Sequence, residues 1–261
     1  MKKQILAVVL VLFVLLGAVT ACSGQKGPSY KDGIYFAQQS TFADSGWKYM
    51  VTFEVKKGKI ASVSWNGANV DAGIDKISLS KAGKYPMVKA GGAQADWHVQ
   101  SKVVEDYLLK TQSVEAPDAI TGATIHYNEF FDLVKEALAK GPVGYGPYKD
   151  GTYHAEQLEF SHGYKYFVDV TVISGYVVAV NWDAYGEGEG AKNKQQASKD
   201  GEYGLVERGG AMAPWWEQAR VVEDYFINNP DPEQPDAISG ATIGLDEFYM
   251  LVNEALKGAK R

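Results

Sequence analysis

PDAITGAT at residues 117–124 returns as PDAISGAT at residues 235–242, an offset of 118 residues. Each copy begins with a proline and an acid, continues through small residues and ends on a threonine. A segment with helical periodicity follows each copy, at about residues 128–140 and 246–257. Because one short pattern recurs at a fixed spacing, the chain is interpreted as a tandem duplication.

The sequence around the two copies repeats in register. YKDGIY at 30–35 matches YKDGTY at 148–153, and VVEDY occurs at both 103–107 and 221–225. In VVEDY the valines and tyrosine are expected to pack, and the two acids to face water. Alternating runs predict one strand hairpin per copy, at 49–55 with 60–65 and at 167–173 with 176–182. The glycine-rich stretches 66–93 and 183–214 are interpreted as long loops.

The predicted fold class is α+β, with two tandem homologous domains that each pack a small antiparallel sheet against helices. The chain has 261 residues, which suits two domains of ordinary size. The expected boundaries are 1–21 for a signal peptide, 22–29 for a lipid-anchored tether, 30–141 for the first domain, 142–147 for a linker and 148–261 for the second domain.

The N-terminus predicts export and lipid anchoring. Lys2 and Lys3 precede an apolar run over 5–19, which is too short to span a bilayer and ends in VTAC at 19–22. The single cysteine of the chain, Cys22, stands where a bacterial lipoprotein signal places its lipidated residue. A lipidated cysteine would hold the mature protein on the outer face of the cytoplasmic membrane.

Composition and motifs exclude several classes of function. Without residues 1–21 the chain has 24 basic against 32 acidic residues, so nucleic acid is not expected as a partner and a polybasic surface cannot supply the anchor. The four histidines have no metal-ligand spacing, and no nucleophile or phosphate-loop motif is present. No metal site and no catalytic residue are therefore predicted, and redox chemistry would have to come from a cofactor.

The repeated motif permits two interpretations. Gly122 and Ala123 leave little bulk beside Thr124, so a large group can approach its hydroxyl, and Asp118 can orient a hydroxyl or help to hold a metal ion that accompanies a phosphate donor. The alternative is an ordinary turn in which Asp118 and Thr121 bond to the backbone and Thr124 caps a helix. Two tryptophans in register are candidates for stacking on a ring ligand, although a core position is favoured for both: Trp97 and Trp215.

The heptapeptide DAI[ST]GAT resembles the flavinylation motif of the FMN-binding domain family. In that family a flavin transferase moves FMN from FAD onto the last threonine and leaves a phosphodiester. The resemblance implies that Thr124 and Thr242 are the acceptors, and that a recognition loop is formed by Asp118, Asp236, Thr121, Ser239, Gly122, Gly240, Ala123 and Ala241. Members in membrane complexes often carry a hydroxyl two positions after the acceptor, where this chain has His126 and Gly244.

The chain as a whole resembles flavinylated lipoproteins of Gram-positive extracellular electron transfer. This resemblance implies two covalent FMN groups, a membrane quinone or dehydrogenase as electron donor, and small extracellular acceptors such as flavins or ferric iron. It also implies an electron-transfer protein rather than a turnover enzyme. Three alternatives stay open: a cofactor-free binding lipoprotein, a terminal reductase with its own pocket, and a lipoprotein whose signal peptide yields a secreted pheromone.

Overall fold

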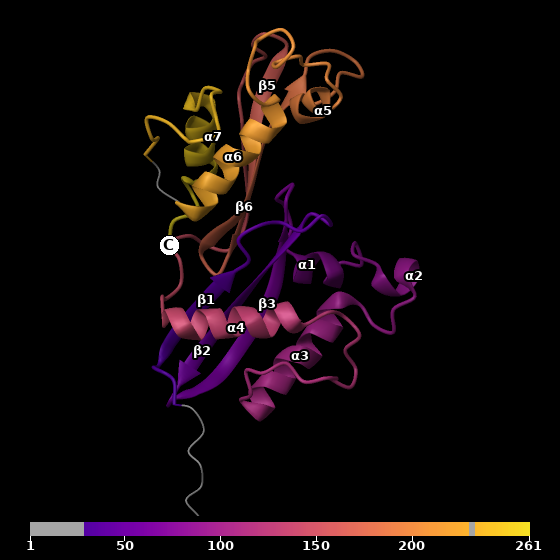
Figure 1. The fold of residues 1–261 in the computed structure, drawn as a ribbon, viewed down its shortest axis with the longest axis vertical. Helices are drawn as coiled ribbons and strands as arrows, with labels where there is room; N and C mark the ends of the chain where they lie inside the picture. The colour runs from indigo at the N-terminus through magenta and orange to yellow at the C-terminus, as the bar shows by residue number, and fades with distance from the viewer. Residues whose placement is uncertain (1–28, 230–232) are drawn as a thin grey trace, which may run out of the picture.

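The structure is a computed structural model that describes residues 29–229 and 233–261 (Figure 1). Cys22 and the predicted signal peptide lie outside the described residues. The first half contains β1 (Gly33–Gln38), β2 (Trp47–Lys56), β3 (Lys59–Asn69), α1 (Lys76–Lys81), α2 (Met87–Gly91), α3 (Trp97–Thr111) and α4 (Asn128–Lys140). The second half contains β4 (Gly151–Glu156), β5 (Tyr164–Ile173), β6 (Tyr176–Gly186), α5 (Lys194–Lys199), α6 (Trp215–Asn228) and α7 (Asp246–Leu256).

Each half forms a three-stranded antiparallel sheet, in the order β1-β2-β3 and β4-β5-β6. The hairpins predicted from alternation are confirmed as β2–β3 and β5–β6, and each sheet also has a first strand that was not predicted. An aspartate in each YKDG segment accepts hydrogen bonds from both backbone N–H groups of the following hairpin turn, at 2.9 Å for Asp32 and at 2.9 and 2.7 Å for Asp150. The repeated YKDG segment thus fixes each turn.

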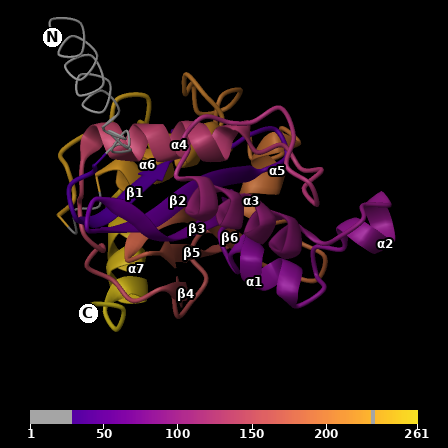
Figure 2. The same ribbon diagram turned by 90° about the horizontal axis from the view of Figure 1, so that it is seen from below.

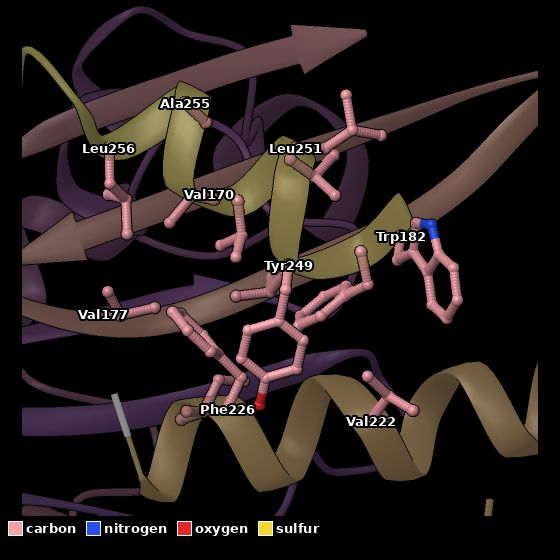
Figure 3. Packing of buried hydrophobic residues seen from close by; sticks show 14 of the residues in the cluster. Val170, Val177, Trp182, Val222, Phe226, Tyr249, Leu251, Ala255 and Leu256 are labelled. Atoms are coloured by element: carbon pink, nitrogen blue, oxygen red, sulfur yellow. The ribbon is translucent and has the colours of Figure 1, made fainter. Parts of the chain in front are cut away.

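One face of each sheet carries the core of its half. Helices α3 and α4 cover the first sheet, and α6 and α7 cover the second. Trp65 and Trp182 lie at the centres of the two cores and are 0% and 1% exposed. Figure 3 shows the second core, where Val222 and Phe226 of α6 and Tyr249 of α7 pack in one cluster with Val170, Val177 and Trp182 of the sheet. Each large apolar side chain buried here stabilises the fold by about 1.5–3 kcal/mol. The predicted α+β class is confirmed.

The glutamate of VVEDY is buried, so the expectation that it faces water was wrong. Glu105 is 6% exposed and Glu223 is 0% exposed. Each lies beside the edge strand of its sheet and accepts the outward backbone N–H of the central tryptophan, Glu105 from Trp65 at 2.8 Å and Glu223 from Trp182 at 2.6 Å. Burial raises the pKa of both carboxyls, that of Glu223 to about 8. A strand N–H under a helix has no water, and this carboxylate supplies its partner.

The two glycine-rich stretches are not plain loops, which corrects the interpretation of 66–93 and 183–214. Strand β3 runs on to Asn69 and β6 to Gly186, and short helices follow. Helix α1 begins at a side-chain cap, because Asp75 accepts the Ser78 N–H at 3.1 Å. In both views α2 projects away from the rest of its domain (Figures 1 and 2). These short helices were missed because they are too short to display a helical period.

The two halves pack through the outer faces of their sheets, opposite the helices. Figure 1 shows the second half above the first, with β6 reaching down to β3. A third, smaller apolar cluster lies at this contact and contains Phe36, Met50, Ala68, Ile173, Val178 and Ala179. Within residues 29–229 and 233–261 no helix is both long enough and apolar enough to cross a bilayer.

Candidate functional site

The repeated motif forms an exposed loop between two helices in each half. Ile120 and Ile238 anchor the loops in the cores and are 7% and 4% exposed. Each isoleucine carbonyl accepts the N–H of the alanine three residues later at 3.0 Å. The intervening glycines have φ of 93° and 90°, a region that L side chains rarely adopt. Each turn thereby brings the last threonine of the motif to the surface.

A buried glutamine holds each of these threonines. Oε1 of Gln100 accepts from the N–H and the hydroxyl of Thr124 at 2.7 and 3.0 Å, and Oε1 of Gln218 accepts from the same two groups of Thr242 at the same two distances. The Nε2 groups donate to Ala95 O at 2.7 Å and to Ala213 O at 2.8 Å. The glutamines are 1% and 2% exposed.

This arrangement orients a hydroxyl oxygen for reaction. Each hydroxyl donates its proton to the glutamine amide oxygen, so the lone pairs of the hydroxyl oxygen remain free to attack another group. Both threonines are exposed. Sequence reasoning missed Gln100 and Gln218. Their recurrence at the offset of 118, three residues after the paired tryptophans, was the available signal.

The other polar residues of the loop are free. Asp118, Thr121, Asp236 and Ser239 are exposed, and within the described part of the chain their side chains make no hydrogen bond or ion pair. Helix α4 has Tyr127 as its N-cap, so Thr124 does not cap it. The interpretation of the motif as a self-bonded turn therefore does not describe this loop. The carboxylates are available to a ligand or to a modifying enzyme.

Both candidate stacking tryptophans lie in the cores. Trp97 and Trp215 are 3% and 2% exposed. Their rings lie 5.4 Å from that of Trp65 and 5.2 Å from that of Trp182. The core position that the sequence favoured is thus where the structure places them, and contact with a ring ligand stays a prediction.

Each tryptophan is also one wall of an aromatic cage around a buried lysine. Lys76 Nζ lies 4.5–5.3 Å from the ring centroids of Trp47, Tyr49, Tyr85 and Trp97. Lys194 Nζ lies 4.4–5.1 Å from those of Tyr164, Tyr166, Tyr203 and Trp215. Each ammonium also donates to a tyrosine hydroxyl, that of Tyr49 at 2.6 Å or that of Tyr166. Cation–π attraction offsets part of the cost of burying these charges.

The caged lysines interact electrostatically with the helices that follow the acceptor loops. Burial lowers the pKa of Lys76 and of Lys194 to about 8, while the nearby charges of Glu129 and Glu247 act in the opposite direction. These glutamates lie in the first turns of α4 and α7, five residues after the acceptor threonines. Trp97 and Gln100 are three residues apart on α3 and so share a face. A buried lysine with a lowered pKa therefore lies near the first turn of the helix that follows each loop.

A groove borders the first acceptor loop. It has a volume of about 550 Å³ and is lined mainly by α1, α3 and β3, including Ile77, His98, Val99, Lys102 and Val103. Val103 also flanks the loop, since a Cβ on Gly122 would lie 3.7 Å from its methyl groups. A partly apolar groove of this size is suited to a cofactor. The exposed hydroxyl, the free carboxylate and the groove fit a group that is attached at the loop and extends along α3.

Residues 45–139 match the family model of the FMN-binding domain. The match includes the first acceptor loop, Gln100, Lys76 and the groove. The first half of the chain therefore contains an FMN-binding domain, and the family predicted from the motif is confirmed there. Its repeat at residues 148–261 carries the same loop, glutamine and caged lysine.

Known proteins similar to this chain each align with less than half of it. The 15 kDa lipoprotein of Treponema pallidum (strain Nichols) is 29% identical over 126 residues, which are 48% of this chain and 86% of that protein. A solution NMR structure from Clostridium thermocellum is 50% identical, covers 42% of this chain and 91% of that chain, and gives a TM-score of 0.34. The crystal structure of CPE2226 protein from Clostridium perfringens is 27% identical, covers 43% and 88%, and gives a TM-score of 0.38.

Proposed function

We propose that Thr124 and Thr242 each carry one FMN through a phosphodiester, and that the mature protein is a lipid-anchored electron carrier outside the cytoplasmic membrane. The observation that carries the proposal is the acceptor geometry. Two exposed threonines are held by buried glutamines through hydrogen bonds of the same two lengths. The first of these threonines, Thr124, lies within the match to the FMN-binding domain. A loop with only a structural role has no need to orient a surface hydroxyl in this way.

Attachment requires a flavin transferase and FAD. The threonine Oγ would form a bond to the phosphorus of the FMN half, the pyrophosphate P–O bond would break, AMP would leave, and the hydroxyl proton would pass to solvent or to a base of the transferase. Gln100 and Gln218 hold the attacking oxygen, and the exposed Asp118 and Asp236 are suited to contact the transferase or its metal ion. The glycines allow the bulky donor to approach, because they place no side chain beside the hydroxyl.

The surroundings of each loop suit an anionic cofactor. The ammonium of Lys76 or Lys194 favours negative charge nearby, and it is shielded from water by its aromatic cage. In the first domain the groove along α3 offers apolar walls for a flat ring system. Bound FMN supplies one- and two-electron transfer, and the protein supplies attachment, orientation and charge.

Cys22 is the proposed anchor, and the name of the similar Treponema pallidum lipoprotein supports this assignment. An anchored carrier on the outer face of a Gram-positive membrane would take electrons from a membrane quinone or dehydrogenase. It would pass them to small acceptors such as soluble flavins or ferric iron. Covalent attachment suits this location, because a dissociable flavin would be lost by dilution.

The carrier role is tested by the kinetics of reoxidation. The flavinylated protein is reduced anaerobically and mixed in a stopped-flow instrument with free FMN or with a ferric chelate. A carrier gives rates that rise linearly with acceptor concentration for both acceptors. Saturation with a single preferred acceptor would instead identify a terminal reductase and would contradict the proposal.

A further inference from the structure

The contact between the two halves uses different surfaces of two equivalent sheets. The first domain contributes the part of its outer face around Phe36 of β1 and Met50 of β2. The second domain contributes the part next to its β5–β6 turn, with Ile173 and Tyr176. The rings of Phe36 and Tyr176 stack at 4.2 Å. Thr52 Oγ1 lies 2.6 Å from Ser174 Oγ. The contact is therefore head-to-tail, and it leaves one surface of each type unused.

The unused surface of the second domain is aromatic. The counterparts of Phe36, Met50 and Ala68 are His154, Phe167 and Tyr185, at offsets of 118 and 117. Tyr185 is 37% exposed and stacks on Phe167 at 4.4 Å. Phe160, the counterpart of the interface residue Phe42, is 42% exposed, and Leu158 beside it is 92% exposed. We call this surface the open face; it is formed by His154, Glu156, Leu158, Phe160, Asp169 and Tyr185 over the mostly buried Phe167.

The open face also carries acids. Asp169 replaces Thr52 at the centre of the face, and Glu156 replaces Gln38 at its edge. His154 lies 2.8 Å from Asp169, and Lys165 lies 2.6 Å from Glu156. The side chains of both acids remain at least a third exposed, so a further cation can still approach them.

The hairpin turn on the unused surface of the first domain is rich in lysine, and one of its lysines, Lys56, pairs with Glu54 at 2.8 Å. This turn has exposed lysines at 56, 57 and 59, where the turn that docks within the chain has Ile173, Ser174 and Tyr176. We call this segment the lysine turn. Ser29 lies against Gly58 of this turn, and the Tyr30 N–H donates to Gly58 O as the Tyr148 N–H donates to Gly175 O beside the docked turn.

We propose that the lysine turn of one chain docks on the open face of a second copy, in the geometry of the contact between its own two halves. In that arrangement the hydrogen bond of Thr52 and Ser174 is replaced by an ion pair of Asp169 with Lys57 of the second copy. Lys56 of the second copy then lies over the aromatic pair of Phe167 and Tyr185. Because the contact is head-to-tail, it repeats and generates rows of chains.

Ion pairs, rather than buried apolar surface, supply most of the attraction in this proposed contact. Ile173, Val178 and Ala179 of the internal interface correspond to Lys56, Ala61 and Ser62 in the lysine turn and the strand after it. The association is therefore weaker than the internal contact and weakens as salt screens the ion pairs. It depends on neither flavin, so it stands or falls independently of the proposed redox function.

The test is sedimentation velocity on the chain from residue 22 onward, with Cys22→Ser, over a concentration series at low and high salt. The wild-type sequence should associate at low salt and dissociate at high salt. Reversal of the turn with Lys56→Glu, Lys57→Glu and Lys59→Glu should lower the association constant at least about tenfold. Glu156→Lys with Asp169→Lys should do the same from the other side.

A matched control and a charge exchange make the test specific. Lys81→Glu, Lys84→Glu and Lys89→Glu change the net charge equally at exposed sites away from the turn and should leave association unchanged. A single chain that carries both reversals should associate with itself again, because each contact then joins a Glu turn to a Lys face. Circular dichroism and melting temperature establish that each variant is folded. A monomeric wild type at low salt, or a reversed turn that associates like the control, would overturn the proposal.

Discussion

The two halves of this protein are alike at the acceptor loops and unlike on the outer faces of their sheets. Around Thr124 and Thr242 the glutamine contacts, the left-handed glycine and the caged lysine all recur. On the outer surfaces the two copies differ: His154 occupies the position that corresponds to Phe36, and Ile173 the position that corresponds to Lys56. The duplication has thus kept the loop and its supporting residues alike while the outer surfaces of the two sheets have diverged.

Removal of one acceptor hydroxyl should have the largest effect, and it should affect only the loop that carries it. Thr124→Ala should abolish attachment at the first site and leave the second fully occupied, and Thr242→Ala should do the reverse, because each hydroxyl is held within its own domain. Peptide mapping by mass spectrometry after co-expression with a flavin transferase measures both sites. Loss of flavin from both sites in either single variant would contradict the independence of the two loops.

The glutamines should matter equally in both halves. Gln100→Ala in the Thr242→Ala background, and Gln218→Ala in the Thr124→Ala background, should each slow flavin attachment roughly tenfold, since the oxygen loses its fixed orientation. A time course of intact mass gives the rate of flavin attachment. A melting curve measures the loss of folding stability of each glutamine variant, about 1–2 kcal/mol, so that the two effects can be told apart. Gln94→Ala, at an exposed position near α3, is the control and should be neutral. Unchanged rates in both glutamine variants would remove the positioning role.

The caged lysines predict a shared dependence of stability on pH. Their folded pKa values of about 8 lie below the ordinary value of 10.5, so between these values the unfolded chain binds more protons and each lysine favours folding increasingly as pH rises. Between pH 7 and pH 10 the wild type should therefore gain about 2–3 kcal/mol of unfolding free energy relative to Lys76→Met or to Lys194→Met. Urea titrations at both pH values measure this difference. Parallel wild-type and variant curves would contradict the assignment.

The smallest expected effect concerns the loop backbone. Gly122→Ala and Gly240→Ala should each cost about 1–2 kcal/mol, because alanine is strained at a φ near 90°. The added methyl meets only ordinary contacts with Val103 or Val221, so the cost is conformational. Gly91→Ala is the control, since Gly91 has no positive φ and nothing would lie within 4 Å of its Cβ. Thermal unfolding ranks the three variants, and equal values would contradict the loop geometry.

The sequence predicts the parts of this molecule that depend on local pattern. Alternation located the two hairpins, the repeat located the two loops, and the family of the first domain followed from the motif. The caged lysines escaped because a lysine in a glycine-rich stretch is ordinarily exposed, and the four rings that surround Lys76 come from three distant parts of the chain. Glu105 escaped for a similar reason, since its role is set by a strand N–H 40 residues away.

The central claim is that two threonines, held alike in two domains, each receive one FMN. The most direct measurement is the intact mass of the chain after co-expression with a flavin transferase. Two FMN increments are expected in the wild type, one in Thr124→Ala or Thr242→Ala, and none in the double variant. A wild type without any increment, or an increment that survives in the double variant, would contradict the claim.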